Sequence, residues 1–148
     1  MQAIIGIPGC WKDRTNLVQK MAREKVILGG KVIYDTESEK GFKLDIYPHD
    51  PRLVEAFTYA SQGNINKTVL DKVATHTFTL YVIHQYSNVL ELKELMRLAT
   101  KVLNAGGLAI KVETAGHKFT ERFLHFFLFV WPFLDLSRTS RGTNPRYV

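Results

Sequence analysis

The hydrophobic residues of this 148-residue chain recur with two periods, one typical of strands and one typical of helices. Strict alternation at residues 42–47 places Phe42, Leu44 and Ile46 on one face, as in a strand with one solvated side. Short apolar or β-branched runs predict further strands at residues 3–7 and 78–83, and strands are also predicted at residues 31–36 and 108–113.

Apolar residues spaced by three and four positions predict the helices. The clearest helix covers residues 89–103, where Asn88 and Glu91 form a capping-box pattern. Further helices are predicted after the capping residues Asp13, Asp50 and Asn66. The glycine pair at residues 29–30 is expected to end the first of them.

The order of these elements predicts an α/β protein of the α+β sandwich type with a mixed sheet of about five strands. The first six elements match the β-α-β-β-α-β order of ferredoxin-like folds, and α-β-α follows. A doubly wound parallel sheet is the alternative, but the amphipathic strand pair at residues 31–47 favours the mixed sheet. We expect a single domain over residues 1–136.

The end of the chain has an unusual composition. Residues 119–133, from Phe119 to Phe133, hold six of the nine phenylalanines and one of the two tryptophans. This apolar run is too short for a transmembrane segment, which needs about 20 residues. It is either a buried helix or an exposed aromatic patch. Such a patch would form a homo-oligomer, bind a protein partner or contact a membrane surface. Residues 137–148, with three arginines and no acid, are expected to form a basic, flexible tail.

Composition narrows the class of protein. The formal charge of +6 includes three charges from the tail, and no basic stripe with interleaved aromatics predicts a nucleic-acid partner. Cys10 is the only cysteine, which excludes an intrachain disulfide and fits a reducing cytoplasm, and no signal peptide is expected at the start. The five histidines lack metal-site spacing, so we predict no metal and no cofactor.

The turn at residues 8–12 is the first candidate site. It joins a predicted strand to a predicted helix, where backbone N–H groups would stabilise a Cys10 thiolate or a bound anion. Cys10 and Trp11 could therefore contribute to a ligand site. The alternative is a turn in which Cys10 is half-buried and Trp11 is a packing lid.

The strand at residues 108–113 is the second candidate. Its period of two places Lys111 and Glu113 on one face, and His117 follows at its carboxyl end. These three residues could bind a ligand, joined by His76 or His84 if the strands are neighbours. The alternative is an ordinary solvent-facing strand edge.

These candidates leave two functions open, and the sequence does not decide whether the protein is an enzyme. The first is a non-catalytic binding or assembly domain. The second is a small enzyme or ligand-binding protein, which requires the turn at residues 8–13 and the Lys111, Glu113 and His117 region to open on the same pocket.

Three segments resemble an uncharacterised bacterial family whose domain has no assigned function. They are Ile7-Pro8-Gly9-Cys10-Trp11-Lys12-Asp13-Arg14, Asp50-Pro51-Arg52-Leu53-Val54-Glu55-Ala56-Phe57 and Ala105-Gly106-Gly107-Leu108-Ala109-Ile110-Lys111-Val112-Glu113-Thr114-Ala115-Gly116. The resemblance covers residues 3–118 and implies a bacterial, cytoplasmic α/β domain. It brings no activity, cofactor or catalytic residue, and the aromatic end of the chain departs from the family pattern.

Overall fold

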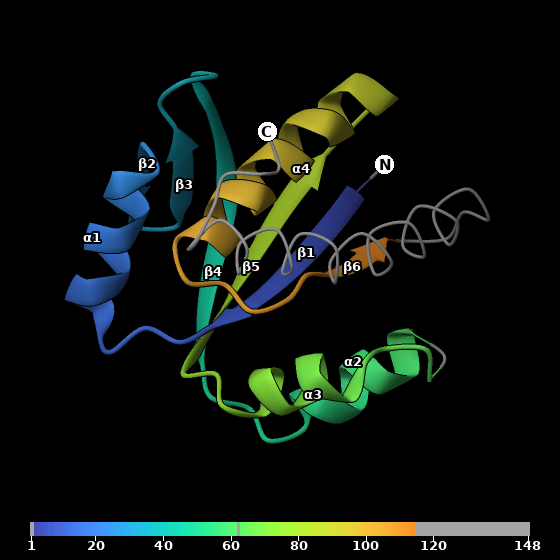
Figure 1. The fold of residues 1–148 in the computed structure, drawn as a ribbon. Helices are drawn as coiled ribbons and strands as arrows, with labels where there is room; N and C mark the ends of the chain where they lie inside the picture. The colour runs from blue at the N-terminus through green and yellow to red at the C-terminus, as the bar shows by residue number, and fades with distance from the viewer. Residues whose placement is uncertain (1, 62, 115–148) are drawn as a thin grey trace, which may run out of the picture.

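A computed structural model describes residues 2–61 and 63–114, which form an α+β fold with an open antiparallel sheet (Figure 1). The strands are β1 (Gln2–Gly9), β2 (Val26–Gly29), β3 (Val32–Asp35), β4 (Lys40–Pro48), β5 (Phe78–Gln85) and β6 (Lys111–Thr114). The helices are α1 (Arg14–Arg23), α2 (Leu53–Ala60), α3 (Lys67–Ala74) and α4 (Val89–Asn104). Across the sheet the strands lie in the order β2-β3-β4-β5-β1-β6. The α+β class predicted from the sequence is confirmed.

The sheet has six strands within the described residues, one more than predicted, because part of the expected first helix is a strand. The helix α1 ends at Arg23, and Lys25 then takes a left-handed backbone conformation (φ 62°) that turns the chain into β2. Gly30 (φ 59°) makes the tight turn from β2 into β3. The glycine pair at residues 29–30 therefore marks a hairpin and not the end of a helix.

Strand direction also differs from the prediction, since every neighbouring pair in the described sheet is antiparallel. The sheet is therefore neither the predicted mixed sheet with a ferredoxin-like start nor the doubly wound alternative. A ferredoxin-like start needs parallel strands on the two sides of its second helix. Here α2 and α3 join β4 to β5, which are antiparallel neighbours. The helix predicted after the last strand lies outside the described residues, as does the basic tail.

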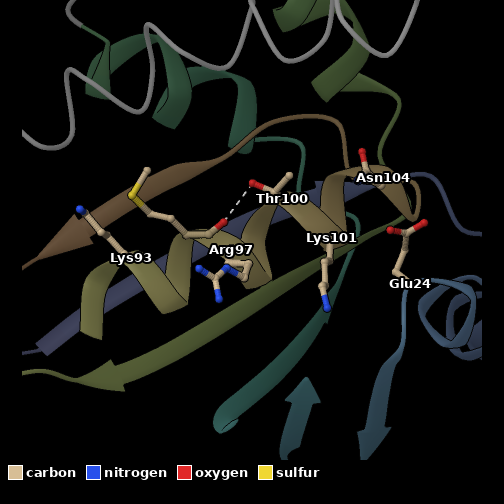
Figure 2. Close-up of a pocket in the computed structure, with 7 residues that line it drawn as sticks. Glu24, Lys93, Arg97, Thr100, Lys101 and Asn104 are labelled. Atoms are coloured by element: carbon tan, nitrogen blue, oxygen red, sulfur yellow. Dashed lines mark hydrogen bonds between the residues drawn. The ribbon is translucent and has the colours of Figure 1, made fainter. Parts of the chain in front are cut away.

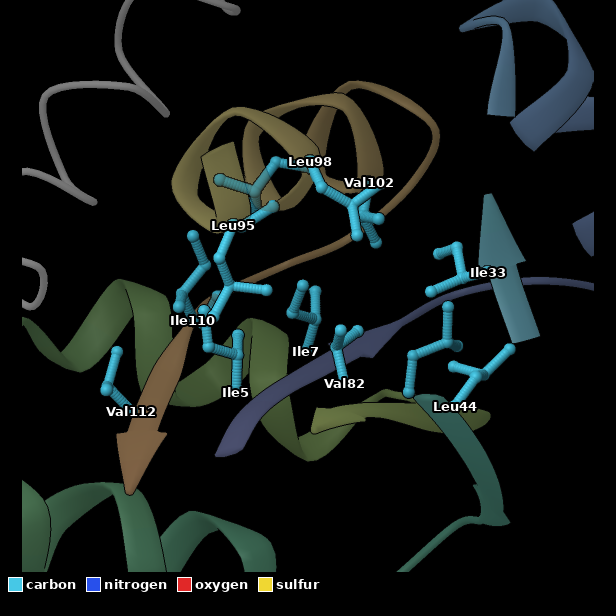
Figure 3. Close-up of a cluster of buried hydrophobic side chains, with 14 of the residues drawn as sticks. Ile5, Ile7, Ile33, Leu44, Val82, Leu95, Leu98, Val102, Ile110 and Val112 are labelled. Carbon is cyan, nitrogen blue, oxygen red and sulfur yellow. The ribbon is translucent and has the colours of Figure 1, made fainter. Parts of the chain in front are cut away.

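The helix α4 covers one face of the sheet and forms the core with it (Figure 3). Its inward residues Leu95, Leu98 and Val102 are at most 1% exposed. They point toward the strand residues Ile5, Ile7, Ile33, Leu44, Val82 and Val112 and toward Ile110, which directly precedes β6. Full burial of an aliphatic side chain contributes about 1.5–3 kcal/mol, so this layer is the main source of stability. None of the helices in the described part of the chain is long and apolar enough to span a bilayer.

Three of the predicted helix caps are present. The Asp13 carboxylate accepts a hydrogen bond from the Asn16 N–H, the Asn66 amide oxygen from the Thr68 N–H, and the Asn88 amide oxygen from the Glu91 N–H. Asp50 instead accepts from the Arg52 N–H one turn ahead of α2. The capping signals therefore locate three helix starts correctly and a fourth to within two residues.

The face of the sheet opposite α4 is only partly covered. The helices α2 and α3 lie on that side, near β1 and β6 (Figures 1 and 3). Over β2, β3 and β4 the same face carries exposed apolar side chains, because these residues alternate with the buried ones under α4. They are Ile27 (55% exposed), Val32 (48%), Tyr34 (36%) and Tyr47 (54%), and we call these four residues the open face.

Candidate functional site

Trp11 is a packing residue in the structure. Its side chain is completely buried, and the indole N–H donates a hydrogen bond to the Ala105 carbonyl at 2.9 Å. The ring fits between two glycines: a Cβ on Gly9 would lie 2.1 Å from ring atom Cη2, and a Cβ on Gly106 would lie 2.7 Å from Nε1. The glycines of the early and late sequence motifs are thus two walls of one slot for Trp11.

Backbone hydrogen bonds join the same two motifs. The Cys10 N–H donates to the Gly106 carbonyl at 3.3 Å, and the Leu108 N–H donates to the Pro8 carbonyl at 2.7 Å. Gly107 is also tightly enclosed, since a Cβ there would lie 2.9 Å from the Ile7 side chain. The glycine pattern that marked these motifs in the sequence is therefore accounted for by close packing.

The thiol of Cys10 is exposed beside the carboxyl-terminal end of α3. It lies 3.4 Å from the Thr75 carbonyl oxygen and 3.5 Å from the Thr75 hydroxyl oxygen. The nearby start of α1 already has a negative group, because the Asp13 carboxylate accepts the Asn16 N–H at 2.7 Å. A second anion at this helix end would meet that carboxylate, so the geometry does not favour the predicted anion site.

The other predicted site residues lie along β6, which runs away from Cys10. The register pairs Lys111 with Gly6 and Glu113 with Ile4. Ile4 is six residues before Cys10 on an extended strand, a separation of about 20 Å. The structure therefore does not bring Glu113 together with Cys10 and Trp11, and His117 lies outside the described residues.

Lys111 is nevertheless unusual, because its side chain is only 8% exposed. It lies on the face of the sheet that α2 and α3 cover. Burial lowers its pKa from the ordinary lysine value, since desolvation disfavours the ammonium form. The alternative expectation, that Lys111 is an ordinary surface residue on a solvent-exposed face, is therefore not met.

The two histidines proposed to join this site are structural. His76 and His84 flank or belong to β5, and β1 separates β5 from β6. His76 is buried: its Nε2 accepts the Asp50 N–H at 3.0 Å and its Nδ1 lies 2.7 Å from the Val73 carbonyl oxygen. His49 stacks on it at 4.3 Å between ring centroids, while His84 packs against the Phe42 ring.

An open hollow of about 510 Å³ lies along the outer side of α4 (Figure 2). Its lining residues are Glu24, Lys93, Met96, Arg97, Thr100, Lys101 and Asn104. The basic residues Lys93, Arg97 and Lys101 repeat every four positions and therefore share this side of the helix. The Thr100 hydroxyl donates its hydrogen bond to the Met96 carbonyl at 3.0 Å, so it has no second proton to donate to a ligand in the hollow.

The charge of Lys101 is matched within the fold. Its ammonium donates to the carboxylate of Asp35, which is 1% exposed, at 2.8 Å, and also to Glu37. Burial alone would raise the pKa of Asp35, but hydrogen bonds from Lys101 and from the Glu37 N–H hold that pKa below its usual value. Lys101 therefore fastens α4 to the end of β3 and is not free to bind a ligand in the hollow.

Comparisons of the chain with protein-family models, with curated proteins and with solved structures gave no match. The family resemblance of the three sequence motifs therefore stays a prediction. Within residues 2–61 and 63–114 no group of three or more histidine, cysteine or acidic side chains could hold a metal ion.

The sequence predicts one solvated face for the strand pair at residues 31–47, but not that apolar side chains lie on that face. Residues 32–35 do not alternate between apolar and polar, because Val32 and Tyr34, on the side that faces solvent, are apolar like the buried Ile33. A strand with apolar residues on both faces is typical of a covered strand. What exposes this face is its position near the edge of the sheet. That position follows from the strand order, so the sequence contains no signal for it.

Proposed function

We propose that the protein is a non-catalytic binding or assembly domain that associates with a second copy of itself through an apolar surface. The observation that supports this proposal is the open face. Ile27, Val32, Tyr34 and Tyr47 lie on adjacent strands and each exposes at least a third of its side chain. By register Ile27 pairs with Tyr34, and Val32 lies two residues before Tyr34 on the same side of β3, so these three side chains are neighbours, while Tyr47 lies four residues beyond Lys43 on β4. A cluster of exposed apolar side chains is typical of interaction sites, whereas single exposed apolar residues are ordinary.

The geometry of the open face favours contact with another surface. Tyr34 lies across from Gly41 and Tyr81 across from Gly6, and each ring leans over the glycine backbone, within 3.5 Å of the position of a Cβ. An aromatic ring that packs over a cross-strand glycine helps to fix the register of the strand pair, so Tyr34 is held in place on the open face. The tyrosines also keep a hydroxyl for the polar rim of an interface.

The aromatic segment at residues 119–133 provides a second apolar element in the same chain. It lies outside the described residues, and it enters the proposal through its composition alone. Protein–protein interfaces are enriched in aromatic residues.

The alternative, a small enzyme or ligand-binding protein, is less well supported. It requires one pocket that contains both the Cys10 turn and the end of β6. The register of β1 with β6 separates Cys10 from Glu113 by about 20 Å along the strand. Trp11, the largest residue of that proposed pocket, is fully buried by packing.

Light scattering of the full chain over a range of concentrations tests the assembly proposal. We expect the mass to rise above that of a monomer with concentration, and Val32→Lys to abolish the rise. Val18→Lys is the matched control, because Val18 on α1 is 45% exposed, close to the 48% of Val32, but lies outside the open face. A wild-type chain that stays monomeric at every soluble concentration, or a Val32→Lys variant that associates as the wild type does, would contradict the proposal.

A further inference from the structure

The strand β2 forms one edge of the sheet, because within the described residues β3 is its only neighbouring strand (Figure 1). It runs from Val26 to Gly29 and contains neither a charged residue nor a proline. Charged side chains and prolines are the usual protection of a sheet edge against pairing with another chain. The strand at the opposite edge of the described sheet, β6, has Lys111 and Glu113. Of these two edges, β2 is therefore the one without such protection.

The outer backbone groups of β2 belong to Val26 and Leu28. On the inner side, the Thr36 N–H donates to the Lys25 carbonyl at 3.0 Å. Successive residues of an antiparallel strand direct their backbone groups alternately toward one side and the other. Lys25 and Ile27 therefore face β3, whereas the N–H and C=O groups of Val26 and Leu28 point away from the sheet. The helix α1 does not cover the open face here, since Ile27 is 55% exposed.

From these observations we propose that two copies of the chain pair along β2, antiparallel and about a two-fold axis perpendicular to the sheet. The inference rests on the proposed function, because it states how the second copy is oriented on the first. Such an interface is isologous, since each copy contributes the same residues. The sheets of the two copies then continue into one another.

The ends of β2 determine the register of this pairing. Val26 pairs with Leu28 of the second copy, where both backbone hydrogen bonds are exchanged, and Ile27 pairs with its own counterpart. Shifted one way, Val26 would have to pair with Gly30, whose left-handed φ of 59° begins the turn into β3. Shifted the other way, Leu28 would have to pair with Glu24, the residue that caps the end of α1. Only the first register uses extended residues alone.

The open faces of the two copies become continuous in this arrangement. Ile27 pairs with Tyr34 within each copy, so both residues of both copies form one apolar row across the axis. In the next row on the same face, Val32 pairs with Gly29, and Gly29 pairs with Lys25 of the second copy. Val32→Lys adds a second positive charge to that row, which explains why it should abolish association.

A disulfide tests the register in the full chain. Two residues in a non-hydrogen-bonded pair, such as Ile27 and its counterpart, have their Cα atoms about 4.5 Å apart, a distance that a disulfide can span. With Cys10→Ser to remove the natural thiol, Ile27→Cys oxidised by glutathione disulfide should give a disulfide-linked dimer. Val18→Cys in the same background is the matched control, because Val18 is 45% exposed on α1, and it should give no such dimer.

A substitution in the backbone tests the hydrogen bonds. Leu28→Pro removes the outward N–H of β2, and proline is tolerated in an edge strand where its N–H side faces solvent. Leu28→Ala loses the packing of the half-buried side chain but keeps the N–H. We expect light scattering to show association of Leu28→Ala and its loss in Leu28→Pro, with far-UV circular dichroism to show that both are folded. Should Leu28→Pro not fold, the disulfide decides.

An Ile27→Cys chain that yields no more covalent dimer than Val18→Cys would overturn the edge pairing, as would a folded Leu28→Pro that associates as Leu28→Ala does. If Val32→Lys still abolished the association of the wild type, the proposed function would stand with the copies arranged differently. A wild type that stays monomeric would overturn both proposals.

Discussion

The slot for Trp11 yields a sharp prediction, because Gly9 has no room for even one additional carbon. A Cβ on Gly9 would lie 2.1, 2.3 and 2.6 Å from three atoms of the Trp11 ring. Carbon atoms in contact are normally about 3.5 Å apart or more, so the ring would have to move by about 1.4 Å. Gly106 blocks the other side of the indole, and the hydrogen bond to Ala105 holds its N–H end.

Gly9→Ala should therefore lower the free energy of unfolding by about 3 kcal/mol, the upper end of the cost of overpacking a core. For a domain of this size that loss corresponds to a fall in Tm of about 12 °C. Urea unfolding followed by far-UV circular dichroism measures the free energy, and near-UV dichroism reports the displacement of Trp11.

Gly29→Ala is the matched control for this substitution. Gly29 also lies in a strand, but a Cβ there would meet nothing within 4 Å. Its unfolding free energy should stay within about 0.5 kcal/mol of the wild-type value.

A double variant identifies the cause of the instability. Phenylalanine lacks the ring atoms that meet the new Cβ. Trp11→Phe should therefore lower the free energy of unfolding by less in the Gly9→Ala background than in the wild type. We expect a coupling energy of about 1–2 kcal/mol. Two results would refute the described slot for Trp11. One is a urea midpoint of Gly9→Ala equal to that of the wild type, and the other is strict additivity of the two changes in unfolding free energy in the double variant.

Three further predictions follow from buried polar groups. Lys101→Met leaves the Asp35 carboxylate buried without its cation and should lower the unfolding free energy by about 3 kcal/mol in the urea assay. Lys93→Met, on the same side of α4, is the control and should change the unfolding free energy little. Burial lowers the pKa of His76 from 6.5, so the folded protein favours the neutral imidazole. The free energy of unfolding should therefore be highest above pH 6.5 and fall as the pH drops below it. NMR should give a titration midpoint for His76 below 6.5, and the free energy of unfolding of His76→Gln should depend less on pH. The buried Thr79 hydroxyl has no hydrogen-bond partner among the described residues, so Thr79→Val should raise the unfolding free energy by about 1 kcal/mol. A loss of that size would show that the hydroxyl is satisfied.

Local signals in the sequence predicted much of the secondary structure. The capping residues Asp13, Asn66 and Asn88 start helices as expected, and the alternation at residues 42–47 marks β4. The strand β2 was missed because four residues are too few to establish a period, and the apolar spacing of α1 continued into them.

The strand order could not be predicted, because it depends on long-range pairing. Neighbours such as Ile4 and Ile83 are separated by about half of the chain. The same limit affected the candidate sites. Glycines 9 and 106 have recognisable motifs, but only the fold shows that both pack against Trp11 and that Glu113 lies far from Cys10.

The open face was the hardest feature to predict. Its residues are apolar, and an apolar strand residue is normally assigned to the core. Val32 and Ile33 are adjacent and similar in character, yet Ile33 is buried under α4 and Val32 is 48% exposed. The difference arises from the strand's place in the sheet and from the position of α2 and α3, which cover the other strands.

The central claim is that the open face is the contact surface, and amide chemical shifts of the full chain at low and high concentration test it most directly. The account predicts that the largest changes with concentration fall on β2, β3 and β4, while the amides of residues 10–13 stay unchanged. Changes centred on Cys10 and Lys111, with β2 to β4 unaffected, would contradict it.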